Sequence, residues 1–309
     1  MNNEYAQYLA VDFLCHILPR RFSYWLAMRV ADGFFRRDEK GRNAVMSNLR
    51  HIHAHRGIQL PEDRLEELTR ETFRNFGKYL ADFFRFTRVS VNEISRLVRV
   101  VHPEYIGQAA GLGKGVLVVT AHLGSWEIGG AILASFGYPV NVVVLPMKDK
   151  RTNALFQSRR GKRGLKVIPL GHTVRGIYSA LLRKELVALL GDRDYSPRHH
   201  EVAFFGAPAR LPIGPAKLCI ATGAPILPGF LIRQPDDTFV LRIHPPISGE
   251  GLSLAEAQGR MVGVLEDEIS QNPSQWFLFD EFWKGDGAPA RPPSERNAPA
   301  LRSPAGEAG

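Results

Sequence analysis

The chain has 309 residues, 44% of them hydrophobic, and a formal net charge of +9. This length allows one large domain or two, with a substantial buried core. The basic excess indicates an anionic partner, such as a membrane surface, a phosphorylated substrate or nucleic acid. The two cysteines, Cys15 and Cys219, lie far apart and no Cys/His cluster occurs, so the sequence indicates neither a disulfide scaffold nor a zinc site.

The first hundred residues are predicted to be mostly helical. Residues 5–18 are apolar at helical spacing, but Asp12 and His16 interrupt the run. The segment lacks the basic start and cleavage site of a signal peptide, and it is shorter than the roughly 20 apolar residues of a membrane span. Residues 22–37 follow, rich in aromatics with basic edges. These helices either pack on the rest of the domain or lie in a membrane interface.

A long amphipathic helix is predicted over residues 60–86, with Pro61 near its start and acidic residues in its first turn. Residues 90–100 are expected to form another short helix. From residue 101 the pattern changes, because short β-branched runs begin to alternate with helical stretches. The predicted strands cover 116–121, 140–145, 166–170 and 186–191, and the helices between them cover 126–136, 150–163 and 173–184.

The later part of the chain adds strands at 225–233 and 239–245, predicted to form an antiparallel hairpin, and a helix at 253–271. The whole pattern predicts an α/β fold, with a mixed, mostly parallel central sheet flanked by helices and a helical N-terminal region. We divide the chain into a helical, membrane-associating region (1–100), an α/β core (101–284) and a tail (285–309). The tail is rich in Gly, Pro and Ala without apolar periodicity, which predicts disorder.

The stretch VVTAHLGSWEIGG, residues 118–130, places a histidine and a glutamate five positions apart. On one continuous helix His122 and Glu127 would point about 140° apart, so they can cooperate only if a helix begins between them. Gly124 and Ser125 allow that break, and Ser125 is a plausible N-cap. A histidine at the end of a parallel strand can act as a general base, with a carboxylate fixing its tautomer. The alternative is a strand-end histidine with a solvated glutamate.

Other catalytic motifs are not supported by their context. Ser125 lies outside a Gly-x-Ser-x-Gly elbow, and no Gly-x-x-x-x-Gly-Lys-Ser/Thr loop occurs. The glycine-rich residues 111–115 precede their strand instead of following it, so they fail the test for a dinucleotide-binding loop. The basic run at 148–166 holds one aromatic residue, Phe156, and matches no known nucleic-acid-binding module, which argues against nucleic acid as the partner.

Two further groups of residues carry candidate chemistry. Arg159 and Arg160 end a predicted helix just before a glycine turn, where a guanidinium suits phosphate or carboxylate recognition. Asp192 and Asp194 follow a buried strand, where they either position basic groups or bind a metal, or simply solvate a loop. Residues 204–228 form either the wall of an apolar slot or ordinary core.

The order of these motifs resembles the bacterial lipid A biosynthesis acyltransferase family. The resemblance rests on AHLGSWEIGG, SRRGKRGLKVIP, LLGDRDYS and FFGAPARLPIGPAKLCIATGAPILP in sequence, and it covers roughly residues 5–284. It implies that an acyl group moves from a thioester of acyl carrier protein or CoA to a hydroxyl of a lipid or glycolipid, similar to a lipid A precursor. It further implies a peripheral or monotopic protein on the cytoplasmic face of a bacterial inner membrane.

The resemblance also assigns residues. His122 matches the catalytic base and Glu127 its acidic partner, while Arg160, with Arg159 beside it, matches a substrate-binding arginine. Asp192 and Asp194 match an Asp-x-Asp element. Backbone amides near Gly124 and Ser125 are expected to stabilise the oxyanion. No metal and no cofactor are expected.

The chain departs from the family pattern at both ends. The family commonly begins with a clear transmembrane helix, which Asp12 and His16 interrupt here. Its C-terminal segment usually reads QWxWxHRRW, whereas residues 275–283 read QWFLFDEFW, with Asp280 and Glu281 in place of the basic pair. The acceptor is therefore open among lipids, and the rival hypothesis is a non-catalytic lipid- or membrane-binding protein with the same fold.

Overall fold

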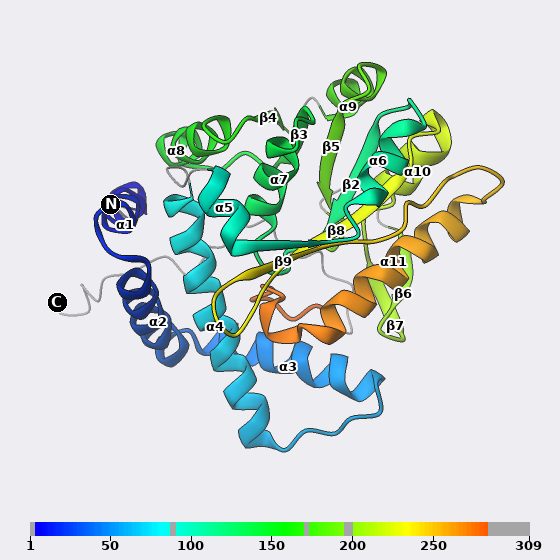
Figure 1. Cartoon of the computed structure of the whole chain (residues 1–309). Coiled ribbons are helices and arrows are strands. Elements are labelled where there is room, and N and C mark those ends of the chain that lie inside the picture. The colour runs from blue at the N-terminus through cyan, green and yellow to red at the C-terminus, as the bar shows by residue number, and fades with distance from the viewer. Residues whose placement is uncertain (1–3, 87–90, 170–172, 195–199, 284–309) are drawn as a thin grey trace.

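The structure is a computed structural model that describes residues 4–86, 91–169, 173–194 and 200–283. It is a mixed α/β protein with a helical N-terminal region, as the sequence predicts (Figure 1). The predicted disorder of residues 285–309 lies outside the described residues. Within the described residues, none of the helices combines the length and the apolar content that a membrane span requires.

The central sheet has seven strands in the order β1-β9-β8-β2-β5-β3-β4. All neighbouring pairs are parallel except β8 and β9, which form the predicted antiparallel pair. The strands are β1 (Val98–Val101), β2 (Val116–Thr120), β3 (Val140–Val144), β4 (Leu165–Pro169), β5 (Leu186–Leu190), β8 (Ile226–Arg233) and β9 (Phe239–Ile243). Because β2 lies in the middle of this order, both of its edges are paired, with β8 on one side and β5 on the other.

The apolar run of β2 explains that position. Val116 and Val118 belong to one buried cluster, and Leu117 and Val119 belong to another on the opposite face. A strand that is covered on both sides is apolar throughout rather than alternating. The covering helices are α6 (Glu104–Gly111), α7 (Trp126–Ser135), α8 (Lys150–Gly161), α9 (Thr173–Leu182), α10 (Gly214–Thr222) and α11 (Leu254–Gln271).

The N-terminal helices gather on one side of the sheet (Figure 1). They are α1 (Glu4–Ile17), α2 (Arg20–Arg37), α3 (Glu39–His55), α4 (Glu62–Arg85) and α5 (Val91–Leu97). The amphipathic α4 contacts α1, α2 and α3, and its buried Phe83 and Phe84 lie against Phe156 of α8. The helix α4 therefore joins the N-terminal region to the α/β part of the chain.

One local prediction was wrong, and one element was not predicted. Residues 98–100, expected to end a helix, belong to strand β1 (Val98–Val101), because this segment pairs in register with β9 at the sheet edge. Residues 201–210 form a small antiparallel hairpin of β6 (Glu201–Phe204) and β7 (Ala207–Arg210) that the sequence reading did not identify. In both cases pairing with a neighbouring strand decides the structure, and the local residue pattern does not.

Candidate active site

His122 and Glu127 lie on either side of a strand-to-helix break, as their spacing predicts. Strand β2 ends at Thr120, and α7 begins at Trp126 with Glu127 in its first turn. Gly124 between them has φ +61°, and a Cβ built on it would lie 2.2 Å from the carbonyl oxygen of Leu231. Only glycine fits both that conformation and that close approach to β8, so this residue makes the turn possible.

His122 is bonded to Asp192. Its Nδ1 lies 2.9 Å from Oδ1 of Asp192, and its backbone amide donates to Oδ2 of the same carboxylate at 3.0 Å. Asp192 is fully buried and follows β5, the parallel neighbour of β2. An ionised carboxylate only accepts hydrogen bonds, so Nδ1 carries the proton and Nε2 carries the lone pair. Among the described residues, no hydrogen-bond partner meets Nε2.

The electrostatic surroundings keep His122 neutral. Burial lowers the pKa of its imidazole below the usual 6.5, and the charge of Arg193 lowers this pKa further, while Asp192 and Glu127 raise it. The pKa of Asp192 is held far below its usual range, against the effect of burial, by the hydrogen bonds from His122 and Trp276 and by the charge of Arg193. A neutral imidazole beside an ionised carboxylate can accept a proton near neutral pH.

Glu127 takes a different partner from the one expected. Its carboxylate forms a two-point ion pair with Arg160 of α8, with Nη2 at 2.5 Å and Nε at 3.1 Å. Both side chains are largely buried. The prediction that Glu127 orients His122 is therefore corrected, because Asp192 holds the ring nitrogen and Glu127 acts on His122 only through its charge.

The two arginines expected to suit phosphate or carboxylate recognition both face carboxylates of the chain itself. Arg160 is paired with Glu127, and Arg159 forms a two-point pair with Asp12 of α1. In each arginine the carboxylate meets Nε and Nη2 and offsets the charge of the guanidinium. This geometry explains why Asp12 interrupts the apolar N-terminal run, since Asp12 neutralises an arginine of α8. Asp194, two residues beyond Asp192, is buried.

The amides of Gly124 and Ser125 are not available as oxyanion donors. Gly124 donates to the carbonyl of Gln275 at 2.9 Å, and Ser125 donates to the carbonyl of Leu231 at 2.8 Å. Ser125 occupies the N-cap position of α7, but its side chain makes no capping hydrogen bond. The expected role of these two residues is therefore corrected: they fix the turn that presents His122.

The sequence reading missed the aromatic side chains around His122. The ring of Trp126 lies edge-on to His122 at 5.2 Å, and Tyr79 of α4 stacks on Trp126 at 4.2 Å. Trp276, from the C-terminal segment, donates its indole N–H to Oδ2 of Asp192 at 2.9 Å. Aromatic residues without a periodic pattern give no signal of this kind, because their contacts join segments far apart in the chain.

Within the part of the chain that the structure describes, no three His, Cys, Asp or Glu side chains are grouped to hold a metal ion. The polar side chains at this edge of the sheet include the His122–Asp192 pair, with the charged Arg193 and Glu127 near it.

Comparison with known proteins identifies the family. The family model for bacterial lipid A biosynthesis acyltransferases matches residues 3–285, nearly the whole chain. The chain is 25% identical to a phosphatidylinositol mannoside acyltransferase of Mycolicibacterium smegmatis, over 73% of this chain and 75% of that protein. It is 24% identical to the protein of that name in Mycobacterium tuberculosis, over 86% and 88% of the two chains. It is also 25% identical to a lipid A biosynthesis palmitoleoyltransferase of Escherichia coli, over 71% and 72%.

Proposed function

Because this chain belongs to the bacterial lipid A biosynthesis acyltransferase family and is an acyltransferase, we propose that it acylates a hydroxyl of a membrane glycolipid, with His122 as general base. The observation that carries this proposal is the buried His122–Asp192 pair at the carboxyl end of β2. The pair leaves Nε2 to meet the substrate, at the sheet edge where open α/β folds place their sites. The donor is a fatty acyl thioester of CoA or acyl carrier protein.

The reaction needs one proton acceptor. The acceptor hydroxyl attacks the thioester carbonyl carbon, and Nε2 of His122 takes the hydroxyl proton as the C–O bond forms. The tetrahedral intermediate then expels the thiolate, and the C–S bond breaks. The proton held by His122 passes to the leaving sulfur, so the imidazole returns to its neutral form. Asp192 stabilises the imidazolium during this cycle, because its carboxylate lies 2.9 Å from Nδ1.

The proposed acceptor class follows from the relatives and from the C-terminal segment. The relatives are named for phosphatidylinositol mannoside and for lipid A, which both combine sugars with fatty acyl chains. Asp280 and Glu281 replace the basic pair of the usual family segment, and a basic pair is the part suited to a phosphorylated sugar. We therefore favour a glycolipid whose acylated sugar lacks a phosphate next to the hydroxyl.

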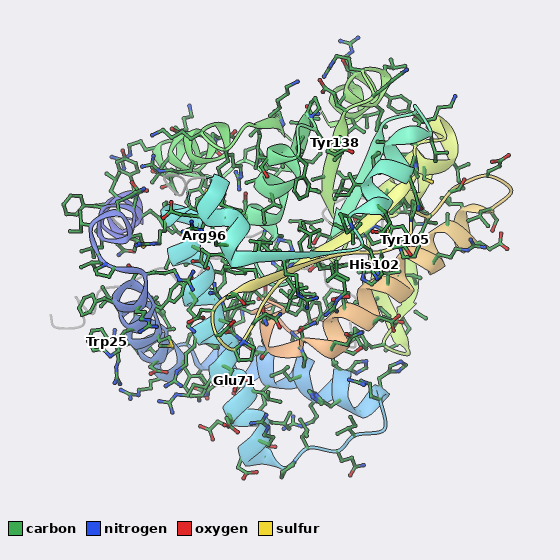
Figure 2. All side chains as sticks on the ribbon, in the orientation of Figure 1. Trp25, Glu71, Arg96, His102, Tyr105 and Tyr138 are labelled. Carbon is green, nitrogen blue, oxygen red and sulfur yellow. The ribbon has the colours of Figure 1, made fainter. Side chains whose placement is uncertain are left out.

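Apolar side chains exposed on α1 and α2 support peripheral binding to a membrane. We call this set the N-terminal face; it consists of Leu9, Phe13, Ile17, Phe22 and Trp25, with Arg21 and Arg29 beside them. Phe13 is 62% exposed and Trp25 is 47% exposed. Figure 2 shows Trp25 at the outer side of α2. Aromatics flanked by arginines suit an interface of anionic lipids, which a peripheral helix enters without spanning the bilayer.

The catalytic proposal is tested by His122→Ala in an assay of CoA and carrier-protein thioesters against a membrane glycolipid extract, with products identified by mass spectrometry. The substitution should lower kcat by about 10²- to 10⁴-fold, the usual contribution of a positioned base. His244→Ala is the matched control. His244 also contacts a buried carboxylate, that of Glu268, but it follows β9 and not β2. Near-wild-type turnover by His122→Ala would show that the proposed mechanism is wrong.

The membrane proposal is tested by flotation with phosphatidylglycerol vesicles. The double substitution Phe13→Ser and Trp25→Ser removes two exposed aromatic anchors and should lower the vesicle-bound fraction at least about tenfold. Leu182→Ser is the control, because Leu182 is 82% exposed on α9, outside the N-terminal face. Equal binding by the double variant and the control would contradict the assignment of this face.

A further inference from the structure

The structure assigns Trp276 as a positioning residue that fixes the plane of the Asp192 carboxylate against His122, an inference that rests on the proposed function. Oδ1 of Asp192 faces the His122 ring, while Oδ2 receives two donors. One donor is the backbone amide of His122 at 3.0 Å, and the other is the indole N–H of Trp276 at 2.9 Å. Two donors on one oxygen leave the other oxygen aimed at Nδ1.

The two donors differ in origin. The His122 amide belongs to the same turn as the base and moves with it. The Trp276 indole comes from a segment 84 residues beyond Asp192, so it fixes the carboxylate independently of β2 and β5. Both donors are neutral, and they orient the carboxylate without cancelling its charge. That charge stays available to an imidazolium at His122.

The backbone around Trp276 is itself tied to the turn that carries His122. Phe277 donates its amide to the carbonyl of His122 at 2.8 Å, and Gly124 donates to the carbonyl of Gln275 at 2.9 Å. Arg193, next to Asp192, donates to the carbonyl of Phe277 at 2.5 Å. Residues 275–277 thus connect the turn after β2 with the turn after β5.

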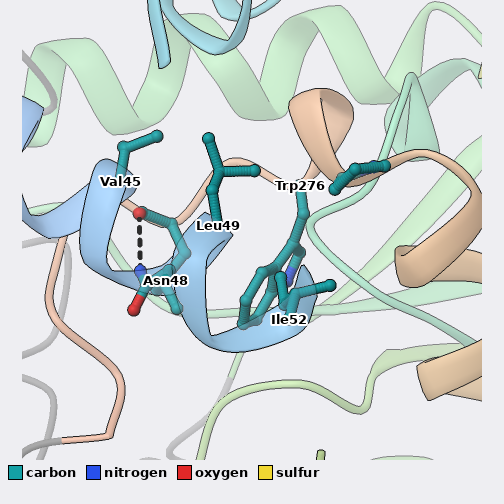
Figure 3. Close-up of a pocket in the computed structure, with 7 residues that line it drawn as sticks. Val45, Asn48, Leu49, Ile52 and Trp276 are labelled. Carbon is teal, nitrogen blue, oxygen red and sulfur yellow. Dashed lines mark hydrogen bonds between the residues drawn. The ribbon is translucent and has the colours of Figure 1, made fainter. Parts of the chain in front are cut away.

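The indole ring is held from its other side by α3. Trp276 is 3% exposed, and it closes a small hollow lined by Val45, Leu49 and Ile52 (Figure 3). Asn48, also in this lining, donates to the carbonyls of Leu278 and Asp280 and accepts from the amide of Phe282. The ring therefore has little freedom to rotate away from Asp192, and the N-terminal region contributes to the geometry of the base.

The indole nitrogen is tested by replacing Trp276 with benzothienylalanine, an isostere in which sulfur takes the place of the N–H. The shape of the side chain and the lining of the hollow are kept, and only the donor is lost. We expect kcat to fall about ten- to hundredfold, the effect of losing one hydrogen bond to a charged group. The KM values of both substrates should stay within about twofold, because Trp276 meets Asp192 and not the substrates.

The pH profile provides a readout that a purely structural role would not move. The charged groups that act on His122 are Asp192, Arg193 and Glu127. Without the indole donor, the Asp192 carboxylate can turn away from Nδ1 and raises the pKa of His122 less, so this pKa falls. The acid limb of kcat/KM should therefore move to lower pH. The proton resonance of the Nδ1–H should shift as well, in a spectrum that needs no turnover.

Trp283 is the matched control, because it is a nearby tryptophan whose indole donates to the carbonyl of Phe204 and not to Asp192. The same isostere at position 283 should leave kcat, the acid limb and the Nδ1–H resonance unchanged. Unchanged kcat and an unchanged resonance in the Trp276 variant would overturn the inference. If His122→Ala is inactive in that case, only the role of Trp276 fails; if His122→Ala remains active, the proposed function itself fails.

Discussion

Two histidine–carboxylate pairs follow strands of the same sheet, and they differ in what else the carboxylate meets. His122 follows β2 and contacts Asp192 at 2.9 Å; His244 follows β9 and contacts Glu268 at 2.8 Å. Both carboxylates are fully buried. Arg242 adds a charged donor to both oxygens of Glu268, at 2.7 and 2.9 Å, whereas the other donors to Asp192 are neutral.

The difference separates a pair suited to catalysis from a pair suited to structure. An arginine at the carboxylate offsets its charge, so less of that charge acts on the neighbouring histidine. Neutral donors orient the carboxylate and leave the charge directed at one imidazole. A buried histidine–carboxylate contact is therefore not sufficient to indicate a base. The charge of the other donors to the carboxylate distinguishes the two kinds of pair.

The largest expected effect separates the two carboxylates. Asp192→Asn should lower kcat about 10³- to 10⁴-fold, because an amide can hold the imidazole in the wrong tautomer. The substitution also removes a charge that raises the pKa of His122, so this pKa should fall and any residual activity should keep its acid limb at lower pH. Steady-state kinetics across pH measures both effects.

Glu268→Gln is the matched substitution at the second pair. It should lower the free energy of unfolding by about 1–3 kcal/mol, because Arg242 and His244 lose a charged acceptor, while kcat stays near that of the wild type. Urea denaturation and the acyl-transfer assay give the two values. Equal losses of activity in Asp192→Asn and Glu268→Gln would mean that the charged donor Arg242 does not distinguish the two pairs.

Much of this arrangement follows from the sequence, and the rest depends on contacts across the chain. The spacing of His122 and Glu127 predicts the break at Gly124, since two residues five positions apart cannot lie on the same face of one helix. The partner of His122 was also within reach: β2 and β5 are parallel neighbours with Thr120 opposite Leu190, so two residues further on His122 stands opposite Asp192. That register requires knowing which strands are adjacent, which the motif order alone does not give.

The contribution of Trp276 was beyond reach of the sequence. Its segment meets the turn after β2 through an isolated bridge between Leu123 and Trp276, outside any strand. Such a contact carries no periodicity and no turn signal. The role of Asp12 also could not be predicted. Its interruption of the apolar run is visible in the sequence, but the ion pair with Arg159 that explains it joins α1 to α8.

Glu127 is the remaining carboxylate, and it resembles Glu268 because an arginine meets it at two points. Glu127→Gln should lower the free energy of unfolding by about 3–5 kcal/mol, since Arg160 is left buried without its counter-charge. Adding Arg160→Gln should restore part of this loss, because the uncompensated charge is then gone. A double-mutant cycle measured by urea denaturation gives the coupling.

The pH profile tests whether the charge of Glu127 also acts on His122, the proposed base. Its charge raises the pKa of His122, so Glu127→Gln should move the acid limb of kcat/KM to lower pH. The control is Asp12→Asn, which leaves the neighbouring Arg159 unpaired in the same way but removes no charge that acts on His122. If the acid limb stays in place in both variants, Glu127 is a structural carboxylate like Glu268. If only Glu127→Gln moves it, the site uses two carboxylates: Asp192 through a hydrogen bond and Glu127 through its field.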